Sequence, residues 1–160
     1  RTRRSTGARR AVIRRTLFGR FFFLPRERKG LAVEVVANLL AACALTAVSP
    51  RRALPQGSVT DAVPVREADL AQAQDHATMV VRIADRLPFL RARCLQRAVA
   101  LRWMLRRRGL ACTVNLALMA GAAERKRAAA GRAHAWVSLG SHVLLGGGAP
   151  EGYVLVARLG

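Results

Sequence analysis

The longest apolar stretch of the chain, residues 31–48, is interrupted in its first half by Glu34 and Asn38. Its length approaches that of a membrane span, but a charge and an amide make insertion into a bilayer costly. We therefore expect a buried helix of a soluble domain and no membrane-spanning segment. Pro50 ends this helix, because proline cannot continue one, and residues 50–65 are predicted to form a loop.

Two further helices are predicted from apolar positions that recur with helical spacing. Residues 67–87 form the first, which stops at Pro88. The second begins near Arg93 and ends in residues 106–109, where three arginines precede a glycine. Cations in the last turn and a glycine just beyond it are typical of a helix C-terminus.

After residue 109 the pattern changes to the alternation of apolar and small or polar residues that is typical of strands. Strands are predicted at 112–118, 133–139, 142–145 and 153–157. The second and third form a hairpin that turns at residues 140–141, and residues 120–132 read as a basic loop. Helices followed by a short antiparallel sheet predict an α+β fold.

With 160 residues, 52% of them hydrophobic, the chain can build one domain with a real core. We assign residues 1–23 to a flexible basic arm, with docking to a peptide or membrane as its functional alternative, and residues 24–160 to a single domain. The net charge of +19 indicates an anionic partner or, equally, an arginine-rich codon bias. Only 5% of the residues are aromatic, which argues against nucleic-acid binding.

The three cysteines, Cys43, Cys94 and Cys112, form no CxxC pair and no cluster with histidine. This spacing argues against a disulfide scaffold and against a metal site, and it fits a reducing, cytoplasmic location. Cys43 and Cys112 lack a matching histidine context and are interpreted as packing residues. We expect His76 and His142 to lie at the surface.

Cys94 and His134 carry the candidate chemistry. Cys94 falls in the first turn of the third predicted helix, and Ala98, Leu101 and Leu105 share its face, so this stripe is expected to pack against the sheet. Backbone N–H groups at a helix start favour a thiolate and can hold an oxyanion. His134, on the second predicted strand, would be the general base. A thiol and an imidazole so arranged are the layout of a papain-like or transglutaminase-like cysteine enzyme.

The segments RCLQRAVALRWMLRRRG (residues 93–109) and AHAWVSL (residues 133–139) resemble the leader peptidases of lasso peptide biosynthesis, the microcin-processing type with a transglutaminase-like core. LPRERKGLAVEVVANLL (residues 24–40) and IADRLPFLRARC (residues 83–94) are also similar to this family. The resemblance implies a cysteine peptidase that removes the leader from a ribosomally made precursor, with Cys94 as nucleophile and His134 as general base and acid. It also implies a small leader-binding protein and an asparagine-synthetase-like cyclase as partners. No directly bound cofactor is implied, and coupling to ATP stays open.

The chain departs from this family at the third catalytic position. The family has an aspartate about twelve residues after the histidine, where this chain has Gly146. A backbone carbonyl, a water molecule or a displaced Glu151 could orient His134 instead. Ser138 is a second departure, since the family often has an acid there. The glycines after residue 145 could alternatively offer a close approach to the backbone of a precursor.

Three alternatives to a leader peptidase stay open. The same Cys–His pair could transfer an acyl group to an amine, or the missing acid could mark a weak or inactive homologue that binds the precursor. The net charge could instead indicate a nucleic-acid-binding or membrane-surface protein. The basic residues near the two motifs are interpreted as solvated charges, with capture of an acidic leader or partner as the alternative; they are Arg97, Arg102, Arg106, Arg107, Arg108, Arg125, Lys126, Arg127 and Arg132.

Overall fold

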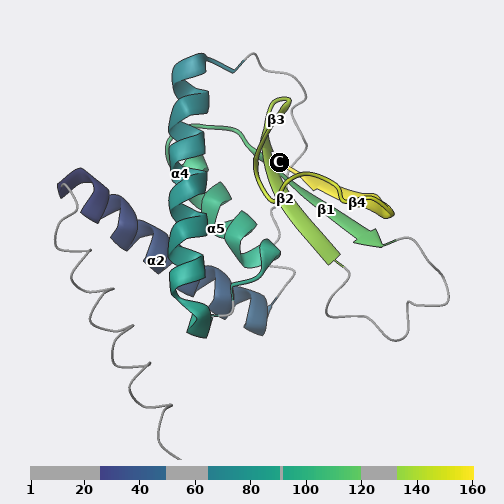
Figure 1. The fold of residues 1–160 in the computed structure, drawn as a ribbon, viewed down its shortest axis with the longest axis horizontal. Coiled ribbons are helices and arrows are strands. Elements are labelled where there is room, and N and C mark those ends of the chain that lie inside the picture. The colour runs from purple at the N-terminus through teal and green to yellow at the C-terminus, as the bar shows by residue number, and fades with distance from the viewer. Residues whose placement is uncertain (1–25, 50–64, 91, 120–132) are drawn as a thin grey trace, which may run out of the picture.

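The computed structural model describes residues 26–49, 65–90, 92–119 and 133–160. Helices α2 (Arg26–Val48), α4 (Glu67–Arg86) and α5 (Cys94–Arg106), with the short 3-10 helix η1 (Pro88–Leu90), precede the strands. Strands β1 (Thr113–Met119), β2 (Ala133–Leu139), β3 (His142–Leu145) and β4 (Tyr153–Leu159) follow them. The predicted α+β class is confirmed (Figure 1).

The element bounds differ from the predicted ones mainly at the ends. Helix α2 begins five residues earlier than expected, at Arg26, and β4 continues to Leu159. The third helix ends as predicted: Gly109 has a φ of 74°, and the Leu110 N–H donates to the Leu105 carbonyl at 3.0 Å. The predicted basic arm, all but the last residue of the predicted loop 50–65, and the predicted loop 120–132 lie outside the described residues.

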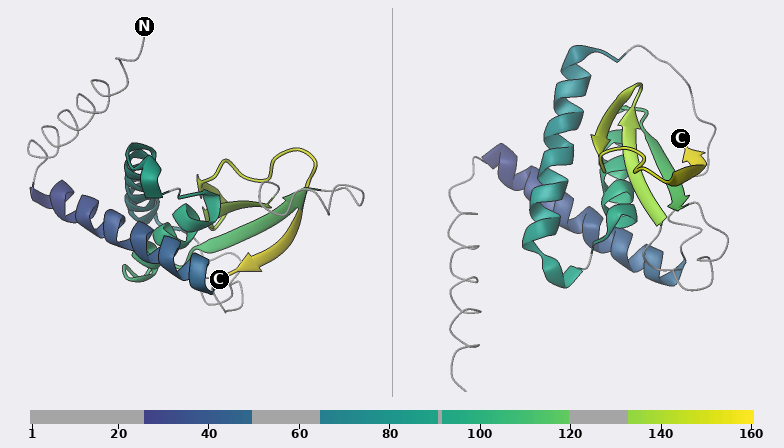
Figure 2. Two further views of the ribbon diagram at one scale, coloured as in Figure 1. Left: turned by 90° about the horizontal axis from the view of Figure 1, so that it is seen from below. Right: turned by 45° about the vertical axis from the view of Figure 1, so that its right-hand side comes forward.

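The four strands form one antiparallel sheet in the order β3-β2-β1-β4. Helix α5 lies in the middle of the molecule, packed against α2 and α4 on one side and against β2 on the other (Figures 1 and 2). Its Ala98, Leu101 and Leu105 are fully buried, as the predicted inward stripe requires. The core therefore joins the helical layer to the sheet through α5, which fixes the start of that helix relative to β2.

Helix α2 is less buried than the sequence suggested. Of the helices that the structure describes, it alone has the length and apolar composition to cross a membrane, yet only 28% of this stretch is buried. Val35 and Leu39 face α4 and α5 and are fully buried. Val33 and Leu40 are exposed. The expectation of a buried helix thus holds for one face only, because α4 and α5 cover a single side of α2.

Candidate active site

Cys94 is the first residue of α5. The preceding Arg93 has an extended backbone, with φ −80° and ψ −177°, and its N–H donates to Oε1 of Gln96 at 3.0 Å. Nε2 of Gln96 also donates to Oγ1 of Thr46 on α2, at 3.1 Å. These contacts fix the first turn of α5 against α2. They place Cys94 at the end of α5 where the backbone N–H groups of the first turn lie.

The thiol of Cys94 reaches the first residue of β2. Its Sγ donates to the carbonyl oxygen of Ala133 at 3.7 Å, and Ala133 directly precedes His134. Strand β3 pairs only with Val137–Leu139 of β2, so the start of β2 has no neighbouring strand on that side. The nucleophile candidate thus lies beside the open edge of the strand that carries the histidine candidate.

The imidazole of His134 is held by a backbone carbonyl. Its Nε2 lies 2.7 Å from the carbonyl oxygen of Gly146, and a carbonyl only accepts, so Nε2 carries the proton and donates. The ring also stacks on Trp136 at a centroid distance of 5.9 Å and meets the edge of Tyr153 at 6.2 Å. The two ring contacts hold the orientation of the imidazole, while the hydrogen bond to Gly146 sets the tautomer and leaves the lone pair on Nδ1, the nitrogen that can accept a proton.

Gly146 occupies the position where the resemblance expects an aspartate, and no side chain fits there. Its φ is 96°, and an added Cβ would lie 2.6 Å from Cβ of Trp136 and 2.8 Å from the carbonyl oxygen of Ala135. The backbone therefore approaches β2 closely enough for the Gly146 carbonyl to reach the imidazole. Glu151, the other candidate for an orienting acid, is exposed, and among the described residues no contact joins it to His134.

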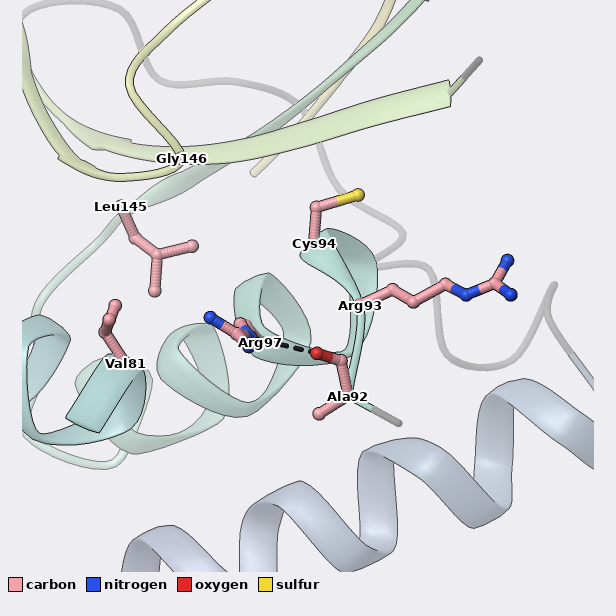
Figure 3. Close-up of a pocket in the computed structure, with 7 residues that line it drawn as sticks. All are labelled: Val81, Ala92, Arg93, Cys94, Arg97, Leu145 and Gly146. Atoms are coloured by element: carbon pink, nitrogen blue, oxygen red, sulfur yellow. Dashed lines mark hydrogen bonds between the residues drawn. The ribbon is translucent and has the colours of Figure 1, made fainter. Parts of the chain in front are cut away.

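A pocket of about 260 Å³ opens beside the thiol (Figure 3). Cys94 projects from the start of α5 toward β2, with its sulfur directed away from Gly146, while Arg97 lies beneath it and donates from Nε to the Ala92 carbonyl at 2.9 Å. The same pocket therefore contains the nucleophile candidate and the residue that holds His134. Its lining is completed by Val81, Arg93 and Leu145.

The two other cysteines have environments that suppress thiol reactivity. Cys112 is buried, and burial raises the pKa of its thiol to about 11. Cys43 is half-buried; its thiol donates to the Leu90 carbonyl at 3.3 Å, and burial raises its pKa. Both positions agree with the packing roles that the sequence indicated.

The expected surface position of His76 was wrong, whereas His142 is exposed as predicted. His76 is 6% exposed, and its Nδ1 lies 2.7 Å from the Gln72 carbonyl. The polar residues around it made its helix face look solvated. In the fold, however, this face of α4 includes Ala73, Ala77 and Val80 and packs into the core.

Several of the arginines near the motifs are bound within the domain instead of being free in solvent. Arg102 is 6% exposed and donates from Nη2 to the Gly160 carbonyl at 2.6 Å, so its predicted solvated position was wrong.

Arg97 pairs with Asp85 at 2.8 Å. Arg106 is exposed as expected. Arg107 and Arg108 both pair with Glu34, at 3.1 and 2.7 Å. The basic residues expected at 125–127 and 132 lie outside the described residues.

Within the described part of the chain, no group of three or more His, Cys, Asp or Glu side chains is placed to hold a metal ion. The chemistry available to this site is that of a thiol, an oriented imidazole and helix-terminal N–H groups. These groups can form an acyl-enzyme by nucleophilic attack, provided that the thiol proton passes to the imidazole.

Comparisons with known proteins agree with this arrangement at the level of the family. The family model described as Transglutaminase-like superfamily matches residues 35–157, which include all the described site residues. No curated protein and no solved structure matches the chain significantly. Domains of this superfamily are typically cysteine hydrolases or acyltransferases. A match over most of the chain, together with the Cys-helix and the His-strand in one α+β domain, shows that this chain belongs to the transglutaminase-like superfamily.

Proposed function

We propose that the protein is a cysteine peptidase that removes the leader from a ribosomally made precursor during lasso peptide maturation. One observation supports the catalytic part of this proposal. The Cys94 thiol donates a hydrogen bond to the carbonyl of Ala133, and the imidazole of the following residue, His134, is held by the carbonyl of Gly146. The assignment to leader removal is supported by the resemblance of residues 93–109 and 133–139 to that family.

The first half of the proposed reaction forms an acyl-enzyme. Sγ of Cys94 attacks the carbonyl carbon of the scissile amide while its proton passes to Nδ1 of His134. The backbone N–H groups at the start of α5, including that of Cys94, hold the oxyanion of the tetrahedral intermediate. The intermediate collapses, the C–N bond breaks, and the imidazolium gives its proton to the departing amine. A thioester between Cys94 and the leader remains.

Water completes the reaction. Nδ1 takes a proton from a water molecule as its oxygen attacks the thioester carbon, and the imidazolium returns that proton to the leaving sulfur. The leader leaves as a carboxylic acid and the free thiol is restored. Throughout both halves the Gly146 carbonyl holds the Nε2 proton, which keeps Nδ1 as the nitrogen that exchanges protons.

The pocket beside Cys94 is the proposed site for the substrate residue next to the scissile bond. Val81, Ala92 and Leu145 give it apolar walls, while Arg93 and Arg97 belong to its lining on the α5 side. We propose that a separate small leader-binding protein presents the precursor here and that an asparagine-synthetase-like cyclase uses the product.

A cleavage assay tests the proposal. The precursor and the leader-binding protein are incubated with the wild-type protein, with Cys94→Ala and with the control Cys43→Ala, and the products are identified by mass spectrometry. We expect leader release by the wild type and the control and none by Cys94→Ala. Equal release by Cys94→Ala would contradict the proposal.

A second candidate function, an inactive homologue that binds the precursor, is favoured by the uncharged carbonyl at the position of the family acid. Precursor binding without cleavage by the wild-type protein would support it. Acyl transfer is separated from hydrolysis by adding a primary amine: an acyltransferase incorporates the amine into the leader as an amide, whereas a peptidase gives mainly the acid.

A further inference from the structure

Helix α2 is apolar on both of its faces, although the described helices and strands cover only one. Ala32, Val35, Leu39 and Ala42 pack against the neighbouring helices and are buried. The exposed positions recur at intervals of three, four and one residues, which places them along one side of the helix. We call this side the outer face of α2; it consists of Gly30, Val33, Ala37, Leu40, Ala41, Ala44, Ala47 and Val48.

The outer face is a continuous apolar surface without a charged residue. Val33 is 59% exposed, Leu40 48% and Val48 84%. Among the elements that the structure describes, α2 runs along one margin, with α4, α5 and the sheet on its other side (Figure 2, left). From Gly30 to Val48 the stripe is about 27 Å long. Soluble proteins rarely leave contiguous apolar surface of this size uncovered unless something binds to it.

The polar side chains of α2 are satisfied away from the outer face. Asn38 donates to the Glu34 carbonyl at 2.7 Å and accepts from Arg107 at 2.8 Å. Thr46 donates to the Ala42 carbonyl at 2.7 Å. The outer face therefore presents aliphatic groups alone. Such a surface suits the acyl chains at a membrane interface.

The charge next to α2 determines which lipid surface fits. Residues 1–30, which lead into the helix, contain eleven basic residues and one acid. Arg28, on the first turn, is exposed. Clusters of basic residues beside an apolar helix are attracted to anionic headgroups, each cation contributing about 1 kcal/mol near the membrane surface. The charge is thus complementary to an anionic membrane.

The contacts of the inner face exclude a spanning orientation for the folded domain. Glu34 pairs with Arg107 and Arg108, which lie just beyond the end of α5. Crossing a bilayer would pull Glu34 from these partners and would expose Val35 and Leu39 of the core. A helix that lies in the interface keeps every one of these contacts.

We propose that the outer face of α2 docks this domain onto the surface of an anionic phospholipid membrane, with the helix parallel to the surface and the basic residues on the headgroups. The proposal is independent of the catalytic function, because it uses none of the groups around Cys94. It places this domain at the membrane surface.

Vesicle flotation tests the proposal with the 160-residue chain. Vesicles of phosphatidylcholine containing phosphatidylglycerol are compared with pure phosphatidylcholine vesicles. The test variant combines Val33→Gln, Leu40→Gln and Val48→Gln. The matched control combines Val143→Gln, Val154→Gln and Val156→Gln, which are also exposed, on β3 and β4. Circular dichroism and thermal unfolding verify that both variants keep the wild-type fold.

We expect the wild type and the control to float with anionic vesicles, less so as salt rises, and the α2 variant to bind roughly tenfold more weakly. Absence of wild-type binding would overturn the proposal, and so would equal binding by the α2 variant. Light scattering provides the other decisive outcome: a wild-type dimer that the α2 variant converts to a monomer would make the outer face a protein interface. Should the triple variant unfold, the single variants L40Q and V48Q are compared instead, each expected to bind about threefold more weakly.

Discussion

The hydrogen-bond acceptor for Nε2 of His134 is a peptide carbonyl. A carbonyl supplies only one of the two effects that a catalytic carboxylate has on the imidazole. A carboxylate fixes the tautomer of the imidazole and also stabilises the imidazolium with a full negative charge. The Gly146 carbonyl, at 2.7 Å from Nε2, provides the same orientation with only a dipole. We therefore expect an assembled Cys–His site with a weaker preference for the ion pair than a complete triad would have.

Alkylation rates test whether this site is assembled in the free protein. We expect iodoacetamide to modify Cys94 at least about tenfold faster than Cys112 at pH 7, since burial raises the pKa of Cys112 to about 11. His134→Ala should lower the alkylation rate of Cys94 roughly tenfold, because the thiol loses its proton acceptor. Peptide mass spectrometry locates each adduct, with Cys43 as a second internal reference.

The control for that experiment is His142→Ala, which removes an exposed histidine from β3. This substitution should leave the alkylation rate of Cys94 unchanged. If Cys94 reacted no faster than Cys43, or at equal rates with and without His134, the two residues would not act as a pair in the free protein.

Gly146 gives a second prediction at the residue scale. Gly146→Asp should lower the free energy of unfolding by about 2–5 kcal/mol and should not restore a third catalytic group. The cause is a positive φ combined with a Cβ only 2.6 Å from Cβ of Trp136. Urea unfolding followed by circular dichroism measures the change.

The neighbouring Gly147 provides a matched control for the steric part of this effect. It also has a positive φ, of 72°, but nothing lies within 4 Å of an added Cβ. Gly147→Ala should therefore cost only about 1–2 kcal/mol, the backbone contribution alone. Equal costs for the two variants would show that the close approach at residue 146 is unimportant.

At the scale of the elements, the carboxylate of Glu34 joins α2 to the residues that follow α5. Glu34 on α2 accepts from Arg108 at 2.7 Å and from Arg107 at 3.1 Å. Hydrogen bonding to Arg108, opposed by partial burial and assisted by Arg107, lowers the pKa of Glu34 from 4.5 to about 2. The ionised form is thus the one that the folded protein stabilises.

This shift predicts how stability depends on pH. The pKa of Glu34 is lower in the folded protein than in the unfolded chain, so its stabilisation is complete above pH 4.5 and is lost as the pH falls toward 2. Glu34→Gln should lower the free energy of unfolding by about 1 kcal/mol at pH 7. The difference from wild type should shrink between pH 4.5 and 2, as measured by urea unfolding.

Asp75→Asn serves as the control, since Asp75 is an exposed carboxylate on α4. It should change stability by less than about 0.5 kcal/mol at pH 7. A constant difference between wild type and Glu34→Gln across the whole pH range would contradict the ionic origin of the effect.

At the scale of the whole molecule, Arg102 joins the central helix to the end of the last strand. Its Nη2 donates to the Gly160 carbonyl, while its Nε is buried without a partner among the described residues. Burial lowers the pKa of this guanidinium. Burying a guanidinium costs desolvation energy that a single hydrogen bond only partly offsets.

We therefore expect Arg102→Met to stay within about 1 kcal/mol of the wild-type free energy of unfolding, because an apolar side chain of similar volume avoids the desolvation cost. Arg102→Ala should lower the free energy of unfolding by about 2 kcal/mol or more, since it leaves a cavity and an unpaired carbonyl. The exposed Arg106→Met is the control and should be nearly neutral. A severe loss in Arg102→Met alone would mean that its charge has a function not explained by packing.

The sequence by itself determined the order and type of the elements and the two candidate catalytic positions. Helical periodicity, Pro88 and Gly109 are local signals, so the bounds of α4 and α5 followed from them closely. The alternation in residues 133–139 and 142–145 likewise predicted β2 and β3 residue for residue. Cys94 and His134 stood out because helix starts and strands have recognisable local patterns.

Only the tertiary structure decided which groups meet. That a carbonyl orients His134 depends on how closely the chain after β3 approaches Trp136, and that distance has no local signature. The burial of His76 and the exposed outer face of α2 depend on which sides of two apolar helices find partners. Hydrophobicity favours burial, but the number of available neighbours sets how much of each helix is covered, and that number is a property of the assembled fold.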